Sequence, residues 1–165
     1  MNWPSTLVDP RAWSEAGMRL QSGEVSLLAL WGEPRLAHMA VIDPTGKVQL
    51  LHLPCADNRF PSIGRLHAPA IRPERAMRDL AGLDGEGSPD ARPWLRHGEP
   101  YSFLAAEGEG LHQIAVGPVH AGIIEPGHFR FTASGETVVR LEERLGYTHK
   151  GIEGLMVGAD LERAV

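Results

Sequence analysis

Four side chains that can carry protons or bind ligands lie within one stretch rich in glycine and proline, residues 117–153. They are His120, Glu125, His128 and Glu153. Glu125 stands between an isoleucine and a proline, where burial would favour its protonated form and let it hold or pass a proton near neutral pH. The alternative is an ordinary turn glutamate bonded to a nearby amide. The stretch is therefore a candidate proton-handling site.

The histidines and Glu153 each allow a plainer interpretation. His120 and His128 are separated by two glycines and a proline, so no single helix places them together. No two of the eight histidines lie within four positions of each other, so a local zinc motif is absent. A hydrogen-bonded or surface histidine fits each position, and Glu153 equally fits an exposed helix carboxylate rather than a metal ligand.

A second group of charged residues, Glu74, Arg75 and Asp79, falls on a short predicted helix. Glu74 and Asp79 are five positions apart and point in different directions, so they do not form an acid pair. We expect Glu74 to form surface ion pairs with Arg75 and Arg78, or the group to contact a partner subunit. Neither a dinucleotide-binding glycine motif nor a Gly-x-Ser-x-Gly nucleophile motif is present.

The composition is that of a soluble globular protein. The chain has 165 residues, 42% hydrophobic and 22% charged, with a net charge of −5. No basic run exceeds two residues, which argues against a nucleic-acid partner. No apolar run approaches the roughly 20 residues that span a bilayer, and the N-terminus does not read as a secretory signal. Cys55 is the only cysteine, so an internal disulfide is excluded and a cytoplasmic setting is compatible.

The first half of the chain predicts an α+β fold, a helix packed on a small antiparallel sheet. A helix is expected to begin at Asp9-Pro10, a capping carboxylate followed by proline, and to end near Gly23. Three strands are expected, at residues 25–31, 36–42 and 48–53. The last two are joined by Asp-Pro-Thr-Gly, a type I turn sequence.

The second half predicts less regular structure. Residues 54–69 read as irregular, Pro73 opens a helix over residues 74–80, and residues 84–100 form an extended surface segment anchored by Trp94 and Leu95.

The Glu-Gly-Glu-Gly of residues 107–110 predicts a domain boundary, giving domains 1–110 and 111–165. The second domain is expected to hold a hairpin over residues 129–141 and a helix from Gly151 that is interrupted near Gly158. The chain stops at Val165 within an amphipathic run. We therefore expect a fragment of a longer protein, which could dimerise to cover apolar surface.

Residues 60–98 resemble the signature of the 30-kDa peripheral subunit of respiratory complex I. The resemblance rests on a serine, a Glu-Arg pair, an Asp-Leu-x-Gly and a Pro-Asp-x-Arg, here Ser62, Glu74-Arg75, Asp79–Gly82 and Pro89–Arg92. Together with the helix and sheet before it, this resemblance covers roughly the first two thirds of the chain. It implies a domain that docks onto neighbouring subunits.

The stretch from residue 117 is similar to the N-terminal end of the large subunit of nickel–iron hydrogenases and of its relative, the 49-kDa subunit of complex I. Ile124–His128 resembles the hydrogenase segment whose glutamate relays protons, so Glu125 would be that relay. Gly151–Glu153 resembles a Gly-x-Glu whose carboxylate binds magnesium, and Gly117–His120 resembles a Gly-Pro-x-His that lines the quinone pocket. Fusion of the two parts is typical of large subunits of formate hydrogenlyase and related membrane-bound hydrogenases.

One departure from the family limits what this chain can do alone. The nickel–iron centre is held by two Cys-x-x-Cys pairs, and the chain has only Cys55, in its first domain. We therefore expect no cofactor in this chain, with nickel–iron, magnesium or quinone bound by the longer parent.

Two functions remain open. The first is a docking part of a complex I-like (NADH:quinone oxidoreductase-like) or hydrogenase-like oxidoreductase, on the cytoplasmic side of the inner membrane, with an iron–sulfur small subunit among its partners. The second is a non-catalytic scaffold.

Overall fold

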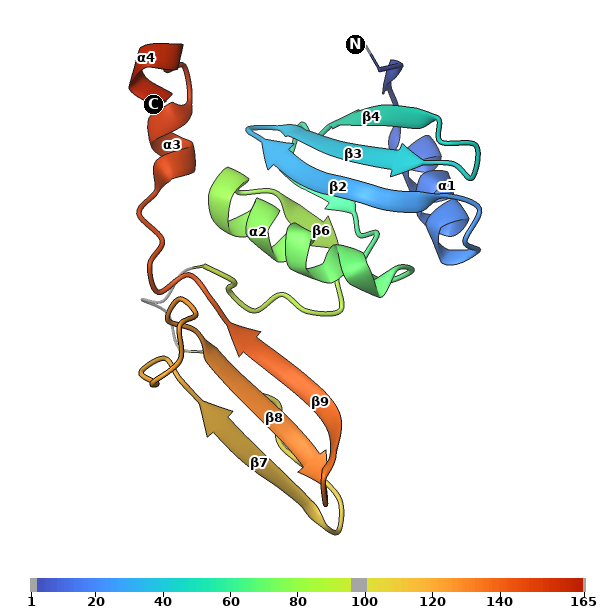
Figure 1. Cartoon of the computed structure of the whole chain (residues 1–165). Coiled ribbons are helices and arrows are strands. Elements are labelled where there is room, and N and C mark those ends of the chain that lie inside the picture. Colours follow the sequence, from blue (N-terminus) through green and yellow to red (C-terminus); the bar gives the residue numbers. More distant parts are fainter. Residues whose placement is uncertain (1–2, 96–100, 165) are drawn as a thin grey trace. The chain divides into compact units, whose positions relative to one another are not determined.

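The structure, a computed structural model, describes residues 3–95 and 101–164 and divides the chain into two compact units, residues 1–94 and 95–165 (Figure 1). This division lies earlier than the boundary predicted at residues 107–110. The reason is that the segment before those glycines is bonded to the second unit: the Leu104 amide donates to the Glu142 carboxylate at 3.1 Å.

The described residues of unit 1 form a four-stranded sheet, a two-stranded sheet, two α-helices and a short 3-10 helix, which confirms the α+β prediction. Its elements are β1 (Ser5–Leu7), α1 (Pro10–Gln21), β2 (Ser26–Glu33), β3 (Leu36–Ile42), β4 (Val48–Pro54), β5 (Arg59–Pro61), the short 3-10 helix η1 (Ala68–Ala70), α2 (Ile71–Ala81) and β6 (Asp84–Glu86). The predicted antiparallel meander is β2–β3–β4. Two parallel pairings were not predicted: β1 with β4, and β5 with β6.

Helix α1 forms as its sequence predicts. The Asp9 carboxylate accepts a hydrogen bond from the Ala12 amide at 2.8 Å, and Pro10 opens the helix. The fully buried Trp13 ring meets Phe60 edge-on at 6.2 Å between ring centres. The Trp13 indole N–H donates to the Pro61 carbonyl at 3.0 Å, so the helix also fixes β5.

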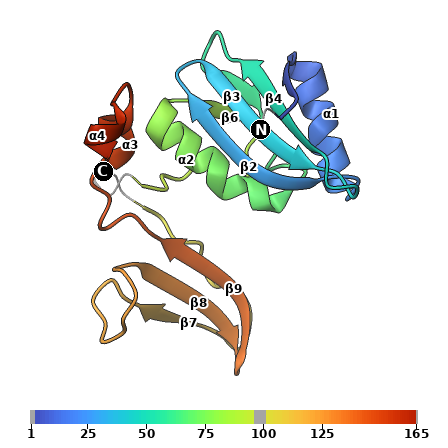
Figure 2. The same ribbon diagram turned by 45° about the horizontal axis from the view of Figure 1, so that its top comes forward.

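Helices α1 and α2 cover the same face of the four-stranded sheet (Figures 1 and 2). Because side chains alternate along a strand, β3 presents its core residues on one face and His38 on the other. The buried core joins both helices to that first face through Trp13, Leu20, Met77, Ala37, Met39 and Val41. The face that carries His38 is left without a helix in the described part of unit 1.

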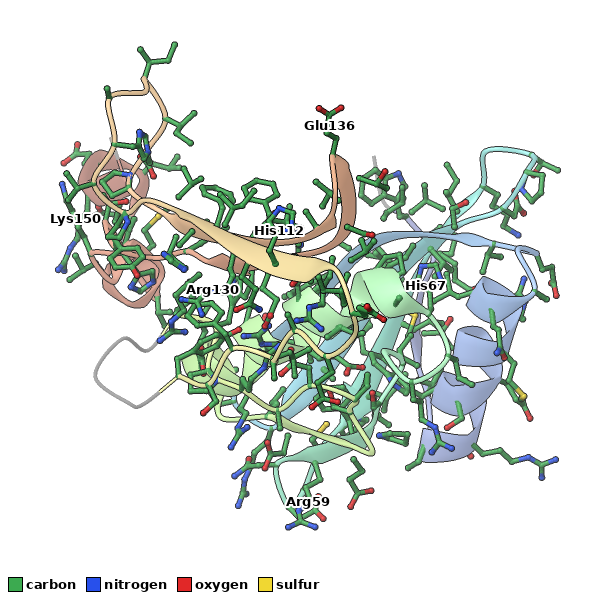
Figure 3. All side chains as sticks on the ribbon, turned by 90° about the horizontal axis from the view of Figure 1, so that it is seen from below. Arg59, His67, His112, Arg130, Glu136 and Lys150 are labelled. Carbon is green, nitrogen blue, oxygen red and sulfur yellow. The ribbon has the colours of Figure 1, made fainter. Side chains whose placement is uncertain are left out.

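Unit 2 contains an antiparallel sheet in the order β7-β8-β9. Its elements are β7 (Leu111–Val116), β8 (His128–Ser134), β9 (Thr137–Arg144), α3 (Ile152–Met156) and α4 (Leu161–Ala164). The predicted hairpin is β8–β9, with Gly135 at φ +58° and Glu136 at its tip, pointing away from the ribbon (Figure 3). The interruption predicted near Gly158 separates α3 from α4.

Candidate functional site

The loop between β7 and β8, residues 117–127, is closed at its base by backbone contact. A Cβ on Gly117 would lie 2.0 Å from the Gly127 carbonyl oxygen, and Gly117 has φ +75°, so only glycine fits there. The His128 Nδ1 lies 3.0 Å from the Gly117 carbonyl and donates to it. The sequence Gly-Pro at one end and Gly-His at the other therefore fixes where the loop starts and ends.

Two imidazole nitrogens at this loop are buried without a hydrogen-bond partner among the described residues. His120 Nδ1 accepts from the Gly122 amide at 2.9 Å, so in the neutral ring the proton is on Nε2. His128 donates from Nδ1, so its Nε2 carries the lone pair. Both Nε2 atoms are buried and unpartnered. One orphan donor and one orphan acceptor at the same loop base are what a polar ligand or partner group would satisfy.

His128 is held from its other side by a segment that the sequence did not identify as part of the site. The centres of the Phe103 and His128 rings lie 5.0 Å apart. The Arg130 guanidinium lies 4.1 Å from the centre of the Phe103 ring. The Arg144 guanidinium likewise lies over the Tyr101 ring, 4.5 Å from its centre. The alternation of Tyr101 and Phe103 was the available signal, since alternate residues of an extended segment share a face.

Glu125, two residues before the loop ends at Gly127, is exposed, so the burial expected from its neighbours is not present in this chain. Ile124 does not shield it, being itself 58% exposed. The Thr148 hydroxyl donates to Glu125 Oε2 at 3.1 Å. Both residues line an open cleft of about 310 Å³ with Gly146, His149, Lys150 and Ile152, and Figure 3 labels Lys150.

The other predicted site residues are not joined to Glu125. No hydrogen bond within the described ranges links Glu125 to His120, whose ring is held by Gly122. Glu153 falls in α3, beside the cleft residue Ile152, and its side chain lies outside the described residues. His120 and His128 thus contact the base of the loop at Gly117, whereas Glu125 is bonded to Thr148.

Glu74 lies in unit 1 and is buried, which corrects the expected surface ion pair. Its carboxylate accepts from the Ser62 hydroxyl at 2.7 Å and from the amides of Ile63 and Gly64 at 2.5 and 2.9 Å. Burial raises the pKa of Glu74, and these hydrogen bonds oppose the shift. The serine and glutamate of the 60–98 motif therefore join a tight turn to α2.

Arg75 is also buried and binds the end of the same motif. Its guanidinium donates to the Asp90 carboxylate at 3.1 Å and to the carbonyls of Arg92 and Pro93 at 2.8 and 2.9 Å. Asp79, one turn later, accepts from the Trp94 amide at 2.7 Å. Glu74, Arg75 and Asp79, predicted as interface residues, are engaged within unit 1 and hold residues 88–94 against α2.

The side chains described here do not suit the metals that the family resemblance implies. Cys55 is the only thiol of the chain. It is buried in the unit 1 core, where its Sγ–H donates to the Leu53 carbonyl at 3.4 Å. Burial raises the pKa of this thiol, whereas a nickel–iron centre needs thiolates. Among the described side chains, no three His, Cys, Asp or Glu could together hold a metal ion.

A helix that crosses a bilayer needs about 20 largely apolar residues. Within residues 3–95 and 101–164, no helix is both long enough and apolar enough to cross a membrane.

The chain is similar in sequence to components of a hydrogenase and of formate hydrogenlyase, although no family model matches it. It is 35% identical over 127 residues to hydrogenase-4 component G of Escherichia coli K12, covering 61% of this chain and 23% of that protein. It is 31% identical over 123 residues to formate hydrogenlyase subunit 5 of the same organism, covering 58% and 22%. A shorter match, 43% over 44 residues, covers 27% of the chain and 12% of the carbon monoxide-induced hydrogenase of Rhodospirillum rubrum.

Among solved structures, the trypsin-resistant fragment of Nqo5 aligns with a TM-score of 0.43 and 21% identity, over 52% of this chain and 80% of that fragment. The chain spans less than a quarter of the length of the curated relatives it matches.

Proposed function

We propose that this chain acts as part of the large subunit of a hydrogenase in a complex I-like assembly. The observation that carries the proposal is the similarity to hydrogenase-4 component G and to formate hydrogenlyase subunit 5, over about three fifths of the chain. In this proposal unit 1 docks onto neighbouring subunits, and unit 2 supplies one edge of the redox site.

Glu125 is the residue we assign to proton transfer. It is exposed, and among the described residues it accepts a hydrogen bond from the Thr148 hydroxyl at 3.1 Å, so its carboxylate is open to a wall supplied by the rest of the parent. A carboxylate enclosed in that way would have its protonated form favoured, as a relay near neutral pH requires. This chain thus positions the Glu125 carboxylate, and the rest of the assembly would bury it.

His120 is assigned to the edge of a substrate pocket. Its buried Nε2–H has no partner among the described residues, so it can donate to an acceptor that enters beside the loop base. A quinone carbonyl is such an acceptor, and it is the ligand that the Gly-Pro-x-His resemblance implies. A partner backbone carbonyl would satisfy the same nitrogen.

Thiolates for a nickel–iron centre must come from outside this chain, because Cys55 is occupied in the unit 1 core. We propose that the partners are the other subunits of a membrane-associated redox complex, including an iron–sulfur small subunit, and that the chain lies on the cytoplasmic side.

The composition of the native assembly tests this proposal. The gene would be tagged on the chromosome, and the protein purified from solubilised membranes and from the soluble fraction for mass spectrometry. We expect peptides of this chain in one polypeptide that also holds two Cys-x-x-Cys pairs, together with an iron–sulfur subunit. Recovery of a protein without those cysteine pairs and without redox subunits would favour the scaffold alternative.

A further inference from the structure

Four polar side chains form a row across the uncovered face of the unit 1 sheet, one from each strand. Ser5 Oγ lies 2.6 Å from His52 Nε2, and His52 Nδ1 lies 2.6 Å from His38 Nδ1. At the far end, His38 Nε2 lies 3.6 Å from Glu33 Oε1, an ion-pair distance. The row follows the strand order β1-β4-β3-β2. His38 and His52 are directly paired in the register of β3 and β4, so the contact is set by the backbone.

The geometry of the two rings limits how many protons they can hold. Their Nδ1 atoms face each other, so one must donate and the other accept. A neutral pair meets this condition, and so does a pair with one added proton, because a protonated ring donates to a neutral one. A second proton would set N–H against N–H and bring two positive charges together at 2.6 Å.

The surroundings of His38 reinforce this limit. The ring is 5% exposed and lies under Trp31, stacked at 5.0 Å between ring centres. Burial lowers the pKa of His38, the Glu33 carboxylate raises it, and His52 lowers it. No other charged group contributes to that shift, and β1 adds only the uncharged Ser5 and Leu7 beside this part of β4.

We propose that His38 and His52 form a site that binds a single proton and makes the folding of unit 1 depend on pH. The unfolded chain takes up two protons at these residues on acidification through the ordinary histidine range near pH 6.5, whereas the folded pair takes up one. Acid therefore favours the unfolded state. Stability from the row is fully present above about pH 6.5 and is lost as the pH falls below it. This inference is independent of the redox function.

Nitrogen-15 NMR of the histidine rings in the full chain tests the site directly. We expect a scalar coupling between His38 Nδ1 and His52 Nδ1 through the N–H···N bond at pH 7.5, and uptake of one proton by the pair between pH 8 and 5. Two rings that each gain a full proton near pH 6.5 and show no coupling would overturn the proposal. This measurement needs no variant, so it does not depend on a substituted protein that folds.

Urea unfolding followed by tryptophan fluorescence gives a second test. All four tryptophans lie in residues 1–94, so the signal reports unit 1. We expect the folding constant of the native chain to fall about tenfold more per pH unit than that of the His38→Gln/His52→Gln variant between about pH 6 and 5. His112→Gln on β7, an exposed histidine labelled in Figure 3, is the matched control and should behave as the native chain. Equal acid sensitivity in the native chain and the double variant would contradict the proposal.

Discussion

Glu74 and Gly64 lie in a contact that leaves no room for a side chain at position 64. The Gly64 amide donates to Glu74 Oε1 at 2.9 Å, and a Cβ on Gly64 would lie 2.9 Å from Glu74 Oε2 and 3.3 Å from the Cα of Ile71. A Cβ on Gly85 of β6 would lie 3.2 Å from Glu74 Oε2 as well. Two glycines of residues 60–98 thus pack on one buried carboxylate.

Glu74→Gln should destabilise unit 1. The substituted amide presents an N–H to a pocket of three donors, which leaves at least one buried donor unpaired at a cost of about 1–3 kcal/mol. The free energy of unfolding, measured in urea by tryptophan fluorescence, should fall by that amount. Glu15→Gln, at an exposed ion pair, is the control and should stay within about 0.5 kcal/mol of the native chain. An equally small change for Glu74→Gln would show that the contact contributes little.

The pH dependence of the same substitution has a defined sign. Burial raises the pKa of Glu74 above its ordinary value of 4.5, so the folded state keeps a proton that the unfolded chain releases. Stability from this group is present below about pH 4.5 and is lost as the pH rises through the folded value. The destabilisation caused by Glu74→Gln should therefore be larger at pH 4 than at pH 7. A penalty that grows with pH instead would mean that the hydrogen bonds to the carboxylate outweigh its burial.

Arg75→Ala should release residues 88–94 from α2. The substitution removes one buried ion pair and two hydrogen bonds to carbonyls, and leaves Asp90 without that arginine. Breaking a buried pair in this way costs about 3–5 kcal/mol. Urea unfolding measures the loss, and Arg11→Ala, at a side chain that is 88% exposed, is the control. Resistance of residues 88–94 to proteolysis in the Arg75 variant would show that Arg75 does not hold this segment against α2.

Gly117→Ala should open the base of the loop that carries His120 and Glu125. The substitution combines a positive φ with a clash against the Gly127 carbonyl. Gly110→Ala separates the two effects, because Gly110 has nearly the same φ, +76°, with nothing within 4 Å of its missing Cβ. Amide hydrogen exchange over residues 118–127 should accelerate in the first variant and remain near native in the second. Equal protection in both would show that the glycine contact does not close the loop.

Much of unit 1 was predictable from local signals. Asp9-Pro10 and the turn at residues 43–46 are strong backbone signals, and they bound α1 and the meander as expected. The strands β1, β5 and β6 were missed because each has three residues and depends on a parallel partner distant in sequence. Such pairing leaves no periodic pattern to recognise.

The burial of charged residues could not be predicted in the same way. A carboxylate next to an arginine reads as a solvated pair, whereas the Glu74 side chain is 2% exposed because the turn at residues 62–64 supplies three donors. The reverse holds for Glu125, whose apolar neighbours suggested burial but lie on an open loop. In both cases contacts remote in sequence decide the environment, and only the Gly-Pro and Gly-His that close the loop were evident beforehand.

The central claim, that Glu125 relays protons in a hydrogenase-type large subunit, is tested most directly by hydrogen evolution in the assembled native complex. Glu125→Gln keeps the size of the side chain and the hydrogen bond from Thr148 but cannot carry the proton, and Glu136→Gln at the exposed hairpin tip is the matched control. Since general acid–base groups contribute about 10²–10⁴-fold, the account predicts a loss of at least about 100-fold for Glu125→Gln, native activity for Glu136→Gln and unchanged subunit composition for both. Native activity of the Glu125→Gln complex would contradict it.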